Sequence, residues 1–140
     1  MSFLEDIEAA KSAPKNRSEP VAVLVNGNLH ELVFYRADGD VWAECVSRHP
    51  ARPDAKIDLR YGYNFNEVVL EIAPTTGRLI EKGVEADIPA DAWAVLIPAL
   101  SGAEISRVTD AIWALNEWDP AQEIEKAKKA LSAGSKKKPS

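Results

Sequence analysis

The 140-residue sequence has one cysteine, Cys45, and two histidines. A single cysteine excludes an internal disulfide bond, which agrees with a reducing compartment. The sequence has no apolar run of about 18 residues, so we expect no membrane-spanning helix. A secretory signal peptide has a basic segment followed by an apolar segment, and residues 1–6 do not begin such a pattern. We therefore expect a cytoplasmic protein.

Motifs for catalysis are also missing. There is no phosphate-binding glycine loop and no G-x-S-x-G nucleophile motif. Cys45 and His49 are four residues apart, and a thiolate–imidazole pair is the nucleophile of cysteine hydrolases. A buried thiol near a histidine at a helix end is the simpler interpretation. His30, Cys45 and His49 lack the paired spacing of a metal site, so we expect no metal. Because the catalytic motifs are missing as well, we also expect no catalytic residues and no cofactor.

The charge of the chain is acidic, with a formal net value of −5. Phosphate binding needs a basic face, so nucleic acid is not expected as the main partner. The basic run Lys136, Lys137 and Lys138 is the exception, and it follows small and polar residues. We predict one domain over residues 1–132 and a disordered basic tail over residues 133–140.

The strongest local signal is the dipeptide Asn26-Gly27, which lies between the β-branched run of residues 21–25 and the alternating stretch of residues 29–35. Both residues tolerate the positive φ angles of a two-residue hairpin turn, so we predict a single β-hairpin over residues 20–36. A lone hairpin is only marginally stable and must pack on other elements. The predicted class is α+β, with the N-terminal β-hairpin packed on a bundle of four to five short α-helices.

Helices are predicted where apolar residues recur at helical spacing next to a capping signal. A short one covers residues 3–12, and the bundle would be formed by residues 38–49, 64–74, 90–100, 101–115 and 120–131. Residues 50–63 have two prolines, one glycine and little periodicity, so we predict a loop there. Asp119 followed by Pro120 predicts an N-cap and the first position of a new helix.

Two tryptophans flank the apolar stripe of the helix over residues 101–115. On a helical wheel Trp113 and Trp118 lie on opposite sides of this stripe, about 100° or more from its centre. They pack on another part of the fold or on a partner, because tryptophan is enriched at interface hot spots. The last helix has only a thin stripe and should dock weakly. Within the helical half over residues 90–131, the predicted partner-binding residues are Trp113, Trp118, Ile124 and Leu131.

Several stretches resemble one protein family, the tail assembly chaperones of long-tailed phages that infect actinobacteria. The middle of that family is matched by Trp42, by His49-Pro50 and by the run Asp58-Leu59-Arg60-Tyr61-Gly62-Tyr63-Asn64. Its helical end is matched by Ala111-Ile112-Trp113-Ala114-Leu115-Asn116-Glu117-Trp118, and the stretch after it by Lys128-Lys129-Ala130-Leu131. The likeness covers roughly residues 3–135, and its motifs consist of fold-building residues.

The resemblance implies a non-enzymatic protein of the host cytoplasm that is absent from the mature virion. It would bind the tape measure protein, the long helical chain that sets tail length, and keep it soluble. A programmed ribosomal frameshift usually appends a further domain in this family, and the extended form would recruit the major tail protein. Lys136, Lys137 and Lys138 lie where such a shift would occur, because A-rich message encodes lysine runs.

Two other functions are compatible with the sequence. One is a structural virion component, such as a head–tail connector or tail terminator, which would self-associate into a ring. Its presence in purified virions would separate it from a chaperone. The other is a small hydrolase that uses Cys45 and His49, for which Cys45→Ser would abolish activity.

Overall fold

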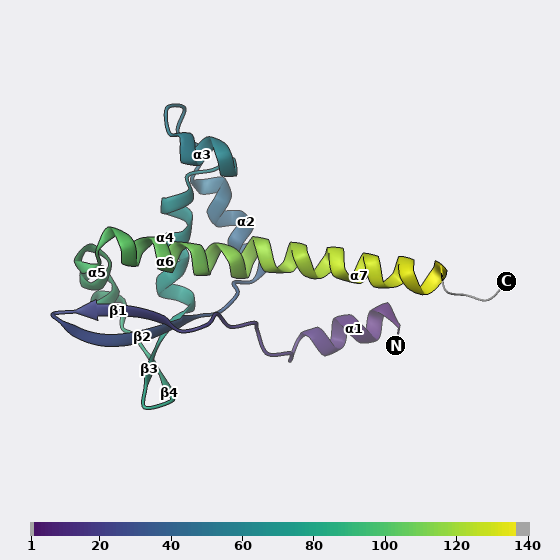
Figure 1. Cartoon of the computed structure of the whole chain (residues 1–140), viewed down its shortest axis with the longest axis horizontal. Helices are drawn as coiled ribbons and strands as arrows, with labels where there is room; N and C mark the ends of the chain where they lie inside the picture. The colour runs from purple at the N-terminus through teal and green to yellow at the C-terminus, as the bar shows by residue number, and fades with distance from the viewer. Residues whose placement is uncertain (1, 137–140) are drawn as a thin grey trace.

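The computed structural model describes residues 2–136 of the chain and confirms the α+β class. The elements in chain order are α1 (Phe3–Ala10), β1 (Val21–Val25), β2 (Asn28–Phe34), α2 (Gly39–Arg48), α3 (Lys56–Tyr61), α4 (Phe65–Thr76), β3 (Gly77–Glu81), β4 (Val84–Asp87), α5 (Ala90–Ala99), α6 (Gly102–Trp113), a π-helical turn (Ala114–Trp118) and α7 (Asp119–Lys136). Figure 1 shows a body of strands and short helices from which α1 and α7 project. Within residues 2–136 no helix combines the length and the apolar character needed to cross a membrane.

The sheet is antiparallel, with four strands in the order β1-β2-β3-β4. The predicted hairpin is confirmed, because β1 and β2 turn at Asn26 and Gly27 with φ angles of 51° and 78°. The expectation of a single hairpin was wrong. A second hairpin, β3 and β4, turns at Lys82 and Gly83 with nearly the same angles, and β3 pairs with β2.

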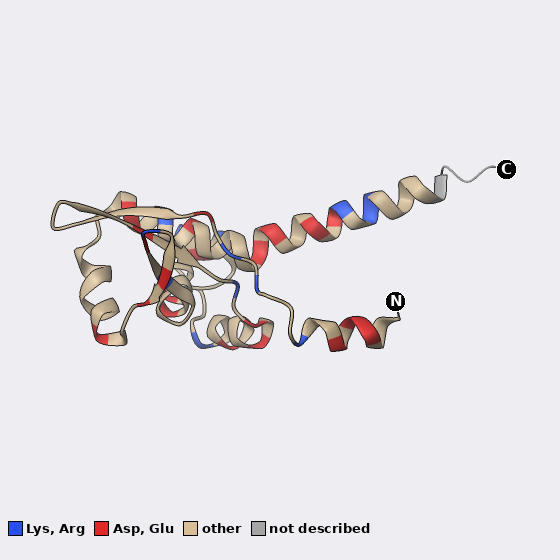
Figure 2. Ribbon diagram, turned by 90° about the horizontal axis from the view of Figure 1, so that it is seen from below, with Lys and Arg blue, Asp and Glu red and all other residues tan. Residues whose placement is uncertain are grey.

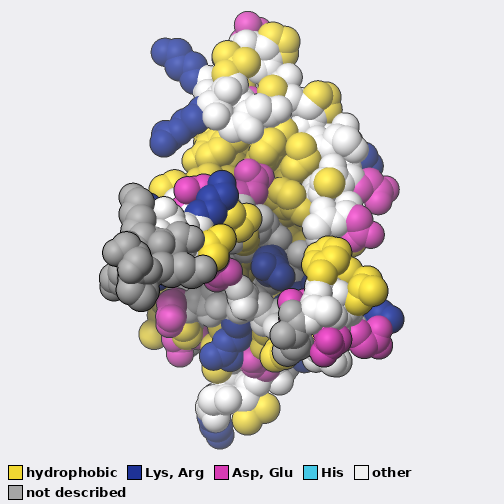
Figure 3. Space-filling view, turned by 90° about the vertical axis from the view of Figure 1, so that its right-hand side faces the viewer, with side chains coloured by type: hydrophobic (Ala, Val, Ile, Leu, Met, Phe, Trp, Pro, Cys, Tyr) yellow, Lys and Arg dark blue, Asp and Glu magenta, His cyan; other side chains and the backbone are white. Residues whose placement is uncertain are grey.

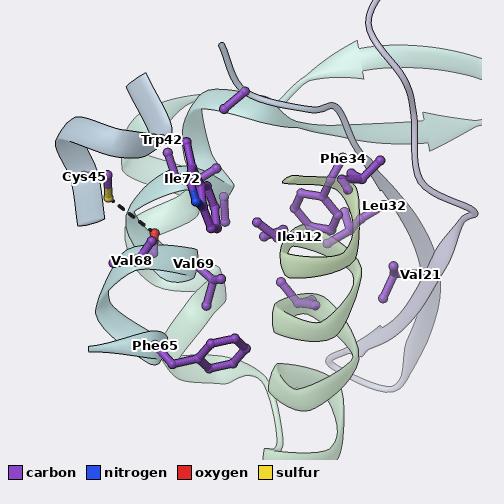
Figure 4. Close-up of a cluster of buried hydrophobic side chains, with 14 of the residues drawn as sticks. Val21, Leu32, Phe34, Trp42, Cys45, Phe65, Val68, Val69, Ile72 and Ile112 are labelled. Atoms are coloured by element: carbon purple, nitrogen blue, oxygen red, sulfur yellow. Dashed lines mark hydrogen bonds between the residues drawn. The ribbon is translucent and has the colours of Figure 1, made fainter. Parts of the chain in front are cut away.

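The core lies between the sheet and helices α4, α5 and α6. Figure 4 shows the side chains of Phe34 and Leu32 on the strand side and of Ile72 on the α4 side, with Ile112 of α6 between them. Trp93 of α5 is also buried, and its ring centroid is 6.3 Å from that of Phe34. Full burial of one large apolar side chain contributes roughly 1.5–3 kcal/mol, so this cluster fixes how the helices cover the sheet.

The loop predicted over residues 50–63 contains helix α3, so that prediction was wrong in part. The apolar side chains of α3, Ile57 and Leu59, are exposed, so the helix has no buried stripe to detect in the sequence. It is held by Asp58, whose side chain is fully buried against Arg52. The helix ends at Gly62, where φ is 86°, a left-handed conformation that glycine adopts without strain.

Helix α7 begins at Asp119, close to the predicted start, but the prediction of an N-cap there was wrong. Asp119 has helical angles, φ −62° and ψ −47°, and helices α6 and α7 are continuous through the π-helical turn. In this turn the amide of Asp119 donates to the carbonyl of Ala114, five residues back. Pro120 has no amide hydrogen to give, and a π-helical turn accommodates such a gap in the hydrogen-bond ladder.

The prediction that the last helix docks weakly on the fold was wrong. Helix α7 stands free of the body. Every side chain over residues 121–134 is exposed. Helix α1, over Phe3–Ala10, also has no buried side chain, and Figure 2 shows α1 and α7 as separate projections. The predicted start of the basic tail at residue 133 falls inside α7, and residues 137–140 of that tail lie outside the described residues.

Candidate partner-binding surface

A row of aromatic rings leads from the core to the surface at the end of α6. The ring of Tyr61 stacks on Phe65 with centroids 4.3 Å apart and meets Trp113 edge-on at 5.3 Å. Trp113 is half-buried, and its ring lies 6.0 Å from that of Trp118, which is 52% exposed. We call the surface formed by Tyr61, Trp113 and Trp118 the aromatic shelf. Trp113 therefore packs within the fold, whereas half of Trp118 is open to solvent.

The π-helical turn is fixed to the body by two polar side chains. Asn116 accepts a hydrogen bond from the amide of Ala37 at 2.9 Å. Glu117 Oε2 accepts from the indole nitrogen of Trp42 at 2.9 Å and from the hydroxyl of Tyr63 at 2.6 Å. Burial and this hydrogen bond to Glu117 raise the pKa of Tyr63 well above its usual range, so the hydroxyl stays a donor. These bonds set the position of Trp113, which precedes the turn, and of Trp118, which is its last residue.

The second candidate surface is an apolar groove between α5 and the sheet. It is lined by Val23, Val25, His30, Leu32, Leu79, Ile88, Ala92, Val95, Leu96 and Ala99. His30 is the only polar side chain among them, and Val95 is 71% exposed. The groove lies partly inside the predicted binding half over residues 90–131, because α5 forms one wall. Such a groove can accept apolar side chains of a partner.

The other predicted binding residues lie on α7. Ile124 is 57% exposed and Leu131 is 76% exposed, and neither lines the groove or contacts the aromatic shelf. Figure 3 shows the face from which α1 and α7 project, where hydrophobic side chains lie between acidic and basic ones. The four predicted residues are therefore not brought together, because Trp113 and Trp118 belong to the shelf and the other two to a free helix.

Cys45 and His49 both contact the carboxylate of Glu71 on α4, a residue that the sequence did not indicate. Glu71 accepts hydrogen bonds from the Cys45 thiol at 2.9 Å and from Arg48, and its other oxygen lies 3.1 Å from His49 Nε2. Cys45, His49 and Glu71 each offer one potential metal-ligand atom, and these atoms lie within 4.8 Å of one another. His30 is not part of this group. Glu71 follows Cys45 by 26 residues, so no local motif connects them.

The environment of Cys45 favours the thiol over the thiolate. Burial, together with the hydrogen bond to Glu71, raises the pKa of Cys45 to about 12. The same cluster lowers the pKa of Glu71 to about 2, first through the Cys45 hydrogen bond and then through His49 and Arg48. A protonated thiol is a poor nucleophile, and the hydrogen bonds of the cluster join α2 to α4.

We predict that the protein loses stability between about pH 5 and pH 2. The folded pKa of Glu71 is lowered, as is that of the buried Asp58, which the Arg52 side chain holds at about 2. Lowered carboxylate pKa values stabilise the fold above the unfolded values near 4 and lose this effect as pH falls through the folded values. Glu71→Gln should cost about 1 kcal/mol at pH 7, because solvent screens the partly exposed pairs.

Urea unfolding of the wild type and of Glu71→Gln at pH 7, 5, 3 and 2 measures this effect. The variant should converge on the wild type at the lowest pH. Glu44→Gln is the control, because the Glu44 side chain is 72% exposed and, in the described part of the chain, forms its ion pair with Arg48 at 3.2 Å. A difference between Glu71→Gln and wild type that stays constant with pH would contradict the assignment.

Comparison of the chain with protein-family models, with curated proteins and with solved structures found no match. The surfaces of the molecule itself therefore have to indicate its function. The groove and the shelf offer apolar and aromatic contacts to a partner. Trp42, Tyr63 and Glu117 fix the position of the shelf.

Proposed function

We propose that this protein is a phage tail assembly chaperone that binds the tape measure protein and keeps it soluble in the host cytoplasm. The observation that carries the proposal is the apolar groove between α5 and the sheet, with Trp118 exposed on the same helical half of the chain. A tape measure helix exposes apolar stripes until the tail tube encloses it, and unprotected stripes self-associate. A groove of this kind binds the apolar side of such a helix.

The family resemblance supplies the remaining parts of the proposal. The chaperone leaves the assembly and is absent from the mature virion. A frameshift near Lys136, Lys137 and Lys138 gives a longer form that also recruits the major tail protein. The alternative, a head–tail connector or tail terminator, is a permanent part of the particle. Mass spectrometry of purified virions separates them, because only the alternative predicts the protein there.

The chaperone proposal is tested by co-expressing the chain with the tape measure protein and measuring how much of the tape measure protein stays soluble. Val95→Glu places a charge at the rim of the groove, where the native side chain is 71% exposed, so folding should be unaffected. We expect the soluble fraction to fall several-fold, because the carboxylate must be desolvated when an apolar helix enters.

Val84→Glu is the matched control. Val84 is 67% exposed, but it belongs to β4 and does not line the groove. This variant should keep the tape measure protein soluble as well as the wild type does. If Val95→Glu and Val84→Glu gave equal soluble fractions at equal stability, the groove would not be the binding site. If the wild-type chain did not raise the solubility of the tape measure protein at all, the chaperone function would be refuted.

A further inference from the structure

Helix α7 is long, exposed and apolar along one line. Its 18 residues extend for about 27 Å, and every side chain over residues 121–134 is exposed. A single helix of this length is only marginally stable in water, and packing usually supplies the rest of its stability. The surface of α7 nearest to Asn16 and Arg17 consists of Asp119, Gln122, Glu123 and Lys126. The apolar line lies about 120° around the helix from this surface, so it does not face Asn16 and Arg17.

The spacing of the apolar residues is that of a coiled coil. Ile124, Ala127 and Leu131 are three and four residues apart, which corresponds to positions a, d and a of a heptad. Pro120 occupies the preceding d position. Two apolar positions per heptad form a narrow seam, whereas a helix that packs on a globular core has a wider stripe. The residues at the outward positions are Gln122, Glu125, Lys126, Lys129, Ser132 and Ala133.

The charges beside the seam indicate its occupant. In this register Glu123 is at position g and Lys128 at position e of the next heptad. A parallel, in-register pair of helices brings position g of one chain to position e of the following heptad in the other. Glu123 of one copy would therefore face Lys128 of a second copy, and twofold symmetry would form the same pair again. An antiparallel pair would instead place like positions opposite each other, Lys128 against Lys128.

We propose that α7 binds α7 of a second copy as a short, parallel, two-stranded coiled coil. Among the described residues Lys128 forms an ion pair with Glu125, at 3.4 Å, and both side chains are well exposed, so little is lost when Lys128 turns to a new partner. Figure 2 shows acidic residues in the first part of α7 and basic residues in its middle. The arrangement places the two bodies at one end of the helix pair and both C-terminal segments at the other.

Sedimentation velocity of the full chain alone, over a range of concentrations, tests the dimer without the tape measure protein. The wild type should dimerise, and Leu131→Glu should raise the dimer dissociation constant at least about tenfold. Ser132→Glu adds the same charge at the neighbouring outward position and should leave the constant unchanged. Circular dichroism of both variants verifies that α7 remains helical. A wild type that is monomeric at every concentration would overturn the proposal.

Charge reversal tests the pairing. Glu123→Lys and Lys128→Glu should each weaken the dimer several-fold, and the double variant should recover it because the pairs are exchanged. Failure of the double variant to recover would refute the Glu123 to Lys128 contact.

Cross-linking tests the direction of the two helices. Leu131→Cys should form a disulfide-linked dimer on oxidation, which only parallel, in-register helices allow. The wild type is the control, because its Cys45 is fully buried. Because the tape measure protein is absent from these measurements, their failure would leave the chaperone function untouched, and the reverse also holds.

Discussion

Replacing Gly77 by alanine is expected to destabilise the fold by about 3 kcal/mol. Gly77 begins β3 directly after α4, and a Cβ atom there would lie 2.6 and 2.7 Å from two ring atoms of Trp93 and 2.8 Å from the carbonyl oxygen of Ala73. Trp93 is 2% exposed and cannot move aside, and the carbonyl belongs to the backbone of α4. Both contacts are too short for real atoms, so β3 must move away from Trp93 of α5 and from the end of α4.

Thermal unfolding and urea unfolding measure this cost, which corresponds to a fall in Tm of about 10 °C for a domain of this size. Gly102→Ala is the matched control, because a Cβ at Gly102 meets nothing within 4 Å and its φ angle is ordinary for an L-residue. It should change stability by less than about 0.5 kcal/mol.

A double-mutant cycle locates the cause of the Gly77→Ala effect. In a Trp93→Phe background the two ring atoms are removed, so Gly77→Ala should cost clearly less than in the wild type. Equal costs in both backgrounds would show that the close approach of Trp93 to Gly77 is not what requires glycine.

The two hairpins show how far local sequence determines this sheet. Asn26-Gly27 is the preferred dipeptide of a two-residue turn, and a β-branched run precedes it, so the first hairpin follows from sequence. The second turns at Lys82-Gly83, with Lys82 at a φ of 51° that lysine seldom adopts. Its strands have five and four residues and no fully buried side chain, so β3 is selected by pairing with β2. Pairing between strands that are far apart in the chain is hard to predict from the local sequence pattern of either strand.

The exposed tryptophan and the apolar groove differ in the same way in how far the local sequence predicts them. The exposed position of Trp118 follows from its angle relative to the buried stripe of α6, which is a local property. The groove does not, because its walls come from β1, β2, β3 and α5, and Val23 and Val95 meet only in the folded chain. Glu71 was missed for the same reason, since it reaches Cys45 from another helix.

The change Trp118→Ala separates partner binding from folding. The side chain is 52% exposed and touches the fold through the ring of Trp113 at 6.0 Å, a contact worth about 1 kcal/mol. Unfolding free energy should therefore fall by no more than about 1 kcal/mol. If Trp118 is a hot spot for the tape measure protein, binding should weaken by roughly 2 kcal/mol, about thirtyfold, because a half-exposed tryptophan offers a large apolar area to a partner.

Two controls limit the interpretation of Trp118→Ala. Trp93→Ala removes a tryptophan that is 2% exposed and should cost about 3–5 kcal/mol of stability, which shows the effect of a core position. Val41→Ala removes a 44% exposed side chain of α2 and should change neither stability nor binding. Thermal unfolding of each variant, beside titration with the tape measure protein, distinguishes the roles. A Trp118→Ala protein that is fully stable and binds as the wild type does would exclude the aromatic shelf and leave the apolar groove as the binding surface.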